Sequence, residues 1–372
     1  MAALPRAESS RPRKYLATPE SPSNMPLMSR PSSKAPVAVV QHPPVFLNLE
    51  LSVARACELT TEAARDGAEL VVFPETWLPG YPVWLDDAPG AGLWGHPPAT
   101  ALYRLLSDNA LSVPGPHFSR LLACAKENKV HLVMGAHERS GGTLYNTMLF
   151  LSRDGATHRS HRKLMPTYTE RLLWGQGDGS TLETLPTEFG PLGGLVCWEH
   201  WMPLARAAMH AQHETIHVAQ WPTVREMHLV ASRHYAFEGR CFVLAAGTVL
   251  ARGDVLAGFR SHGSAADQAG LELLQQIPGD DATLLQRGGS AIIAPNGDLL
   301  AGPLHGQSGI LHAELDLSLI TAGHLTLDTQ GHYSRPDVFQ LSVNTTPQAN
   351  VSFAPPQTVS GSRPDVRAPL GG

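Results

Sequence analysis

The sequence predicts a single α/β domain in which mixed β-sheets are covered by helices. Three observations predict it. Segments with strand and helix character alternate along the chain, short apolar runs such as 69–73 lack polar alternation, and several strand pairs are joined by tight turns. Continuous apolar runs are typical of strands buried on both faces, and helices must cover such strands. The pattern is compatible with a sandwich of two sheets.

Strands are predicted where short segments are rich in β-branched and apolar residues and stop at a turn signal. Arg153-Asp154-Gly155 and Asn296-Gly297 mark two hairpin turns. In chain order the predicted strands or hairpins lie at 36–41, 69–73, 130–138, 144–152, 156–164, 193–198, 213–222, 241–249, 290–303 and 309–317.

Helices are predicted where apolar residues recur at helical spacing. The first ends before Asp66-Gly67, a pair typical of a helix C-terminus. Residues 81–116 are rich in Pro, Gly and Trp and predict a long loop with one short helix, and long ordered loops are usually functional. The predicted helices lie at 47–65, 101–107, 117–128, 202–212 and 224–240.

Composition excludes several classes of protein. The chain has 372 residues, 42% of them apolar, and a net charge of −5 with His neutral. No basic stripe indicates nucleic acid, and no apolar stretch at the N-terminus is long enough for a signal sequence or a membrane span. The 18 histidines are scattered, without HExxH or CxxC spacing, which argues against a metal hydrolase. We therefore expect an enzyme of the cytoplasm that binds neither nucleic acid nor membrane.

The two ends of the chain differ in composition from the middle. Residues 1–35 are rich in Ser, Pro and Arg, and the residues from 345 onward are rich in Pro, Ser and Gly. Such segments do not bury enough apolar surface to fold. We expect a disordered extension at 1–35, one domain at 36–344 and a flexible tail at 345–372.

Cys197 is the cysteine with the most unusual surroundings. It ends the predicted strand GGLVC, and a helix-like segment with Pro203 in its first turn follows within a few residues. Helix N-termini favour the thiolate form of cysteine, which is the nucleophile. A buried structural cysteine, as expected for Cys57, Cys124 and Cys241, is an equally good interpretation from this context alone.

Two charged residues follow strands in the same way. Glu75 comes directly after the apolar run VVFP, where partial burial would raise its pKa toward that of a useful base. Lys163 closes the basic run HRSHRK at the end of a hairpin strand, where a buried ammonium would stabilise negative charge on a substrate. Taken singly, each is better explained as a solvated surface charge.

The three residues together, in the order Glu, Lys, Cys, resemble the nitrilase superfamily of carbon–nitrogen hydrolases. The matching segments are FPETWLPGYP (73–82), HRKLMPTYTERLLWGQGDGS (161–180) and GGLVCWEHWMPLAR (193–206), and the resemblance extends over about 37–341. CWEH and GHYSRPDV are similar to the true nitrilase branch. The resemblance implies an αββα sandwich of two mixed sheets and hydrolysis of an organic nitrile to the carboxylic acid and ammonia.

The resemblance also implies a mechanism that needs no metal and no cofactor. Glu75 takes the proton of Cys197, the thiolate forms a thioimidate and then a thioester, and Lys163 stabilises the developing negative charge. Glu170 matches a further active-site glutamate of the family, although an acid favoured by a helix N-terminus explains it nearly as well. The backbone N–H of Trp198 is a candidate oxyanion donor.

The substrate pocket is predicted from aromatic residues close to these motifs. His200 stands where many nitrilases have Asn, and it indicates a difference in substrate preference. The predicted substrate-binding residues are Trp77, Tyr81, Trp84, Trp198, His200 and Trp201.

Alternatives remain open at this point. The same three residues hydrolyse amides, and related enzymes stop at the amide or act on cyanide. A catalytically silent scaffold is a second alternative, because family members assemble into dimers and spiral filaments. The resemblance implies such a homo-oligomer here, with 202–212 and 224–239 as the candidate dimer surface.

Overall fold

Two mixed β-sheets form the centre of the protein. The computed structural model describes residues 33–349 and 351, except 264–266. The predicted extension at 1–35 and tail at 345–372 therefore lie largely outside the described residues. Among those described, no helix is long and apolar enough to cross a membrane.

The first sheet has six strands in the order β13-β1-β2-β3-β4-β5. Strands β1, β2 and β3 are parallel, while β13, β4 and β5 run antiparallel to their neighbours. The strands are β1 (Lys34–Gln41), β2 (Leu70–Val72), β3 (His131–Ser140), β4 (Thr143–Leu151), β5 (His158–Arg162) and β13 (Gly309–Asp316).

The second sheet has seven strands, in the order β10-β11-β9-β8-β7-β6 with β12 also paired to β11. Its centre, β7-β8-β9, is parallel. The strands are β6 (Leu185–Thr187), β7 (Gly190–Val196), β8 (Ile216–Gln220), β9 (Phe242–Ala246), β10 (Val249–Ala251), β11 (Leu284–Ile293) and β12 (Leu299–His305).

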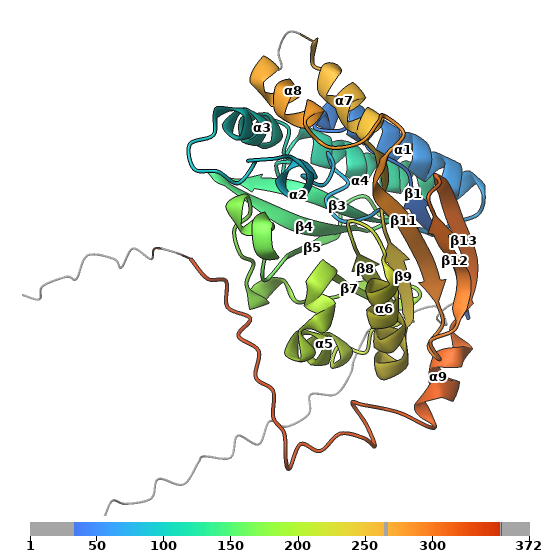
Figure 1. The fold of residues 1–372 in the computed structure, drawn as a ribbon. Helices are drawn as coiled ribbons and strands as arrows, with labels where there is room; N and C mark the ends of the chain where they lie inside the picture. Colours follow the sequence, from blue (N-terminus) through green and yellow to red (C-terminus); the bar gives the residue numbers. More distant parts are fainter. Residues whose placement is uncertain (1–32, 264–266, 350, 352–372) are drawn as a thin grey trace, which may run out of the picture. The chain divides into compact units, whose positions relative to one another are not determined.

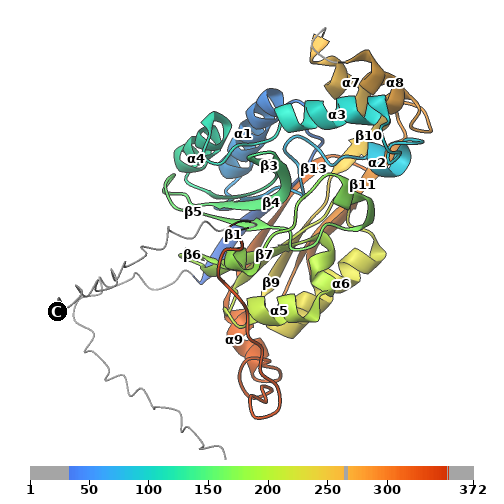
Figure 2. The same ribbon diagram turned by 90° about the vertical axis from the view of Figure 1, so that its left-hand side faces the viewer.

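Helices cover the outer face of each sheet, so the layers follow the order helix, sheet, sheet, helix (Figures 1 and 2). α1 and α4 lie on the first sheet, and α5 and α6 lie on the second, whereas α2, α3, α7 and α8 form a separate apolar cluster at one end. The helices are α1 (Leu49–Arg65), α2 (Trp84–Asp87), α3 (Pro97–Asp108), α4 (Pro116–Asn128), α5 (Pro203–His210), α6 (Glu226–Gly239), α7 (Arg252–Arg260), α8 (Gln268–Gln275) and α9 (Ser318–His324).

Alternation along β1 shows how the layers are specified. Val37 and Val39 pack in the core between the two sheets, while Ala38 and Val40 pack with α1 and α4 on the other face. Successive side chains of a strand point to opposite faces, so a strand that is apolar throughout serves two cores at once. The predicted two-sheet sandwich is confirmed, and it explains why these runs show no polar alternation.

The predicted elements are present with small differences at their ends. The strand predicted at 193–198 ends at Val196, because Cys197 has a left-handed backbone with φ of 54° that cannot continue a strand. α3 begins at Pro97, earlier than predicted, with Pro in the favoured first turn. Several short elements were not predicted, namely α2, β6, β10, α7, α8 and α9.

Candidate active site

Cys197 lies at a sharp turn between β7 and α5. It opens a 3₁₀-helix, Cys197–Trp201, and its side chain is buried, with 4% exposed. Glu199 holds this turn, because its carboxylate accepts hydrogen bonds from the backbone N–H of Val196 (2.6 Å) and of Leu164 (2.7 Å). His161 donates to the same carboxylate at 2.9 Å. Glu199 therefore joins the end of β7 to the end of β5, which are the strands that lead to Cys197 and Lys163.

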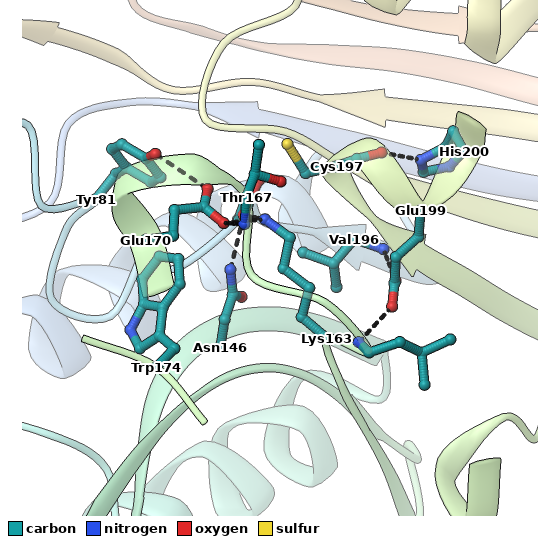
Figure 3. Close-up of polar contacts among 12 residues, drawn as sticks. Tyr81, Asn146, Lys163, Thr167, Glu170, Trp174, Val196, Cys197, Glu199 and His200 are labelled. Atoms are coloured by element: carbon teal, nitrogen blue, oxygen red, sulfur yellow. Dashed lines mark hydrogen bonds and ion pairs between the residues drawn. The ribbon is translucent and has the colours of Figure 1, made fainter. Parts of the chain in front are cut away.

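Glu75, Lys163 and Glu170 meet beside the thiol, and Figure 3 shows Lys163 and Glu170 next to Cys197. The Nζ of Lys163 lies 3.0 Å from Oε1 of Glu75 and 2.7 Å from Oε2 of Glu170, and all three side chains are buried. A carboxylate oxygen of each glutamate and the Sγ of Cys197 lie within 4.8 Å of one another. The structure thus brings together all four residues that the sequence predicts to be catalytic.

Each of these side chains is fixed by its neighbours. The side-chain Nδ2 of Asn146 on β4 donates to Oε1 of Glu75 at 2.7 Å, and the backbone carbonyl of Asn146 accepts from the backbone N–H of Lys163 at 2.8 Å. Tyr81 donates its hydroxyl to Oε1 of Glu170 at 3.0 Å. Gly135 on β3 lets the backbone of residues 74–76 approach closely, because an added Cβ would lie 2.1 Å from the carbonyl oxygen of Pro74.

Burial and charge set the protonation states. Burial raises the pKa of Glu75 to about 7, although the Lys163 charge opposes this rise. Burial also raises the pKa of the Cys197 thiol well above its usual value, and the negative charge of Glu75 adds to the effect. Burial lowers the pKa of Lys163, but Cys197, Glu75 and Glu170 outweigh it and raise that pKa overall. The resting site therefore holds a neutral thiol beside an ammonium group.

The geometry gives Glu75 a free oxygen for proton transfer. Its Oε2 is buried and has no hydrogen-bond partner among the described residues. A buried unpaired carboxylate oxygen is costly unless a proton or a ligand satisfies it. The backbone N–H of Trp198 lowers the pKa of the Cys197 thiol, against the effect of burial. Base, cation and backbone donor therefore surround one sulfur atom.

This cluster does not suit a metal ion, although two carboxylates and a thiol are a possible ligand set. The Lys163 ammonium already bonds to Glu75 and to Glu170. A divalent cation at the same carboxylate oxygens would lie against this positive charge and would be repelled. Lys163 therefore supplies the positive charge of the site.

A cavity of about 250 Å³ opens in front of Cys197. Its wall combines aromatic surface with charged and polar groups from α2, α6, β11 and the segments between the elements. The lining residues are Tyr81, Val83, Asp86, Asp87, Thr167, Tyr168, Thr169, Glu170, Cys197, Trp198, Pro222, Thr223, Arg225, His228, Leu285 and Gln286.

Only two of the six predicted substrate-binding residues, Tyr81 and Trp198, line this cavity. Trp77 and Trp84 do not line the cavity, because both are buried in apolar clusters. Trp77 packs edge-on against Phe73 and donates its Nε1–H to the carbonyl of His42 at 2.7 Å. Their position near Glu75 in sequence reflects packing of the loop that carries it.

His200 and Trp201 also lie away from the cavity. His200 is buried behind Cys197 and hydrogen-bonds to its carbonyl oxygen at 2.8 Å. Trp201 is partly exposed and packs against Trp198 and Trp221. Both residues belong to the turn Cys197–Trp201, whose short 3₁₀ geometry turns successive side chains in different directions.

Several residues of the site were not predicted. Asn146 and Glu199 could not be assigned from sequence, because Asn146 bonds to Glu75 and Glu199 bonds to Leu164, which lie 71 and 35 residues away. Arg225, His228 and Gln286 reach the cavity from segments more than 25 residues beyond Cys197. One such group could have been found from the sequence. His217 and Gln220 are polar residues in β8, a strand that is buried throughout, and buried polar side chains need hydrogen-bond partners.

Residues 36–324 match the family model described as carbon-nitrogen hydrolase. Nitrilase 1 of Arabidopsis thaliana is 39% identical over 323 residues, which are 87% of this chain and 90% of that protein. An aliphatic nitrilase of Sinorhizobium fredii is 38% identical over 324 residues, which are 86% of this chain and 98% of that protein. The structure of Saccharomyces cerevisiae Nit3, a member of branch 10 of the nitrilase superfamily, aligns with a TM-score of 0.59 over 82% of this chain and 98% of that one. At 17% identity, that likeness supports the fold alone.

Proposed function

This chain belongs to the carbon–nitrogen hydrolase family and to its nitrilase branch, and from this premise we propose that it hydrolyses a small organic nitrile to the carboxylic acid and ammonia. The observation that carries the proposal is the arrangement of Glu75, Lys163 and Glu170 around the Cys197 thiol at the base of a cavity. The relatives that are named nitrilases are similar to the chain over most of its length.

Attack on the nitrile begins with proton transfer from Cys197 to Glu75. The unpaired Oε2 of Glu75 is the acceptor, and its raised pKa of about 7 suits a group that must take and return a proton near neutral pH. The sulfur then bonds to the nitrile carbon, and one carbon–nitrogen π bond becomes a lone pair on nitrogen. Lys163 and the Trp198 N–H stabilise this charge, and proton transfer from Glu75 gives a neutral thioimidate.

Two water molecules complete the reaction. Glu75 removes a proton from the first as it adds to the thioimidate carbon, and the tetrahedral intermediate releases ammonia to leave a thioester. The second water adds in the same way and releases the carboxylic acid and the Cys197 thiol. Glu170 holds Lys163 in place through its 2.7 Å contact and is itself held by Tyr81 and by the backbone N–H of Thr167. Release of the thiol instead of ammonia from the first intermediate would give the amide.

The cavity supports a small substrate with an apolar or aromatic part. Tyr81, Tyr168 and Trp198 offer aromatic surfaces, whereas Asp86 and Arg225 offer charges in the same wall. A pocket of about 250 Å³ suits a compact nitrile. Aliphatic, aromatic and arylacetonitriles all belong in the substrate test.

The proposal is tested by measuring ammonia, acid and amide from a panel of these three nitrile classes. We expect the acid and ammonia in equal amounts from at least one class, and we expect Cys197→Ala to lose at least about 10⁴-fold in rate, because Cys197 is the only cysteine among the described residues that line the cavity. Cys57→Ala is the matched control, since Cys57 is a partly buried cysteine on α1 far along the chain from the site. Substantial activity in Cys197→Ala, or no turnover of any nitrile or amide, would contradict the proposal.

We propose further that the protein forms homodimers through α5 and α6 and that the dimers assemble into spirals. Large apolar side chains are exposed on these helices and the turn before them, and exposed apolar patches of this kind mark interaction surfaces. They are Trp198, Trp201, Met202, Leu204, Met227, Val230 and Phe237. Sedimentation of the wild type and of Leu204→Asp tests this: we expect the variant to dissociate, and identical sedimentation would exclude this surface.

We also propose that the protein is located in the cytoplasm. A nucleophilic thiol is best kept reduced in that compartment. Fractionation of the source cells with an antibody to the chain tests it.

A further inference from the structure

A buried row of polar side chains leads away from Cys197 on the side opposite the cavity. Nδ1 of His200 lies 2.8 Å from the carbonyl oxygen of Cys197, and Nε2 of His200 lies 3.0 Å from Nε2 of His217. Nδ1 of His217 lies 2.8 Å from Oε1 of Glu214, whose other oxygen accepts from the hydroxyl of Tyr235. All four side chains are buried. None of them takes part in the mechanism proposed above.

With both imidazole rings neutral, the partners set the direction of every hydrogen bond in this row. A carbonyl oxygen only accepts, so Nδ1 of His200 carries the proton and, in the neutral ring, Nε2 accepts. His217 must therefore donate from Nε2, and in its neutral form it accepts at Nδ1. The protonated carboxyl of Glu214 is then the donor to His217, while Tyr235 donates to Glu214. The bonds run in one direction and end on the carbonyl of Cys197.

Burial favours the neutral form of each group. It lowers the pKa of His200 to about 3 and the pKa of His217 well below its usual value. It also raises the pKa of Glu214 to about 7, so that this carboxyl keeps its proton in mildly acidic solution. Stacking of His200 on Trp221 and of His217 on Tyr235 holds the rings in the orientations that these bonds need.

The carbonyl that receives this row belongs to the same peptide unit as the Trp198 N–H. A trans peptide is planar, and its C=O and N–H point in opposite directions. A bond that holds the carbonyl therefore also sets the direction of the N–H. Figure 3 shows the consequence: His200 lies on the carbonyl side of Cys197, while the sulfur points away from it. Hydrogen bonds in a row also polarise one another, which makes the N–H at the far end a stronger donor.

We propose that His200 is a positioning residue: its Nδ1–H bond to the Cys197 carbonyl fixes the rotation of the Cys197–Trp198 peptide and so directs the Trp198 N–H at the charge that develops during attack by the thiol. This inference rests on the proposed function, because it assigns a role within thiol addition. It places His200 behind the nucleophile, with no contact to the substrate. His217, Glu214 and Tyr235 keep His200 in the tautomer that can donate.

Two substitutions of His200 separate this role from simple packing. In His200→Asn the side-chain Nδ2 occupies the position of the imidazole Nδ1, so the bond to the carbonyl is retained and the bond to His217 is lost. In His200→Gln the amide reaches the position of Nε2, so the bond to His217 is retained and the bond to the carbonyl is lost. Both variants keep a neutral amide in the buried site, and thermal unfolding of each monitors folding.

The test measures acylation of Cys197 by p-nitrophenyl acetate as a burst of nitrophenol, beside alkylation of the same thiol by iodoacetamide. Acylation passes through an oxyanion, whereas alkylation is a direct displacement that forms none. We expect His200→Gln to lower the acylation rate about 100-fold, the typical effect of losing one oxyanion donor. His200→Asn should stay within about 3-fold of the wild type, and alkylation should change less than 10-fold in both.

The outcomes distinguish this inference from the proposed function. Equal acylation rates for the Asn and Gln variants, or equal losses of acylation and alkylation in the Gln variant, would overturn the role of His200. A wild type that is acylated by the ester but hydrolyses no nitrile would overturn the proposed function while the comparison between the two variants still stands. If kcat for a nitrile is measurable, its loss should follow the acylation rate with KM changed less than about 3-fold.

Discussion

The two sides of Cys197 carry different kinds of buried polar groups. On the cavity side, the Lys163 ammonium lies between the carboxylates of Glu75 and Glu170. On the opposite side, His200 and His217 continue a row of hydrogen bonds to Glu214. Burial raises the pKa of both Glu75 and Glu214 to about 7, yet their partners differ. Glu75 faces a cation and a thiol, whereas Glu214 faces a neutral imidazole and a phenol.

This difference shows how the same residue type serves two purposes. Charges next to the thiol stabilise states in which negative charge appears, and they work best in a dry site. A neutral row behind the thiol adds directional bonds without adding another buried charge, which would be costly. Reactivity therefore comes from the cavity side and geometry from the opposite side.

Removal of the cation should have the largest effect. Lys163→Met should lower kcat/KM at least about 10³-fold, since charge stabilisation is lost. It should also lower the free energy of unfolding by about 3–5 kcal/mol at pH 8, because Glu75 stays buried without its partner. Without the cation, the folded-state pKa of Glu75 rises further, so the folded protein holds a proton that the unfolded chain releases above its own pKa. The folded wild type also keeps this proton below about pH 7, so the deficit should grow as the pH rises above about 7 and should be larger at pH 8 than at pH 5.

Urea unfolding at both pH values measures this deficit. Lys126→Met, at an exposed lysine on α4, is the matched control and should change neither kcat/KM nor the free energy of unfolding. A deficit that is independent of pH would show that Glu75 is not held by the Lys163 charge.

The pH dependence of the wild type is the next test. Glu75 must be ionised to accept the thiol proton, and burial raises its pKa to about 7. We expect kcat/KM to rise about tenfold per pH unit below that value and to level off above it. Glu75→Gln should lower the rate by at least about 10²-fold and remove this limb of the profile. If kcat/KM of Glu75→Gln still rose with pH in the same way, a group other than Glu75 would be responsible for that rise.

Substitutions of Glu214 should have smaller effects, because that side carries no required charge. In Glu214→Gln the amide can donate to His217 and accept from Tyr235, so kcat should stay within about twofold. In Glu214→Leu both neighbours lose their partner, and we expect about a tenfold loss of kcat with about 2 kcal/mol less stability. Steady-state kinetics and urea unfolding of the pair measure this. Equal losses in both variants would show that Glu214 acts as a carboxylate.

The smallest effect on kcat and KM is expected at Trp77, which lies neither in the cavity wall nor in the row of hydrogen bonds behind Cys197. Trp77→Phe loses the bond to the carbonyl of His42 and should cost about 1–2 kcal/mol of stability with kcat and KM unchanged. Tyr81→Phe loses a bond to Glu170 at the cavity wall and should reduce kcat several-fold. A larger change in KM for Trp77→Phe than for Tyr81→Phe would indicate that Trp77 contributes to substrate binding.

The sequence predicted the candidate catalytic residues from two signals together: each lies at or just after a strand end, and their combined motifs resemble the nitrilase superfamily. Glu75 comes after β2, Lys163 after β5 and Cys197 after β7, and strand ends are visible as apolar runs that stop. The layers were predictable for the same reason, since strands that are apolar on both faces need cover on both sides.

The pocket was not predictable in this way, because its wall is assembled from distant segments. Aromatic residues near a motif look the same in sequence whether they pack, as Trp77 does, or line a cavity, as Tyr81 does. Arg225 and Gln286 approach the site only through the fold. The row behind Cys197 had one local signal, His217 within a fully buried strand, since a buried polar side chain requires a partner.

The left-handed backbone of Cys197 has a further consequence, for the evolution and engineering of this protein. Side chains other than glycine lose roughly 1–2 kcal/mol in that conformation, so Cys197 is less stable at φ of 54° than glycine would be. The position thus sacrifices stability for reactivity, as functional sites often do. Selection for thermal stability alone, without a screen for activity, would favour loss of the nucleophile, and Cys197→Gly should melt at a higher temperature than Cys197→Ala.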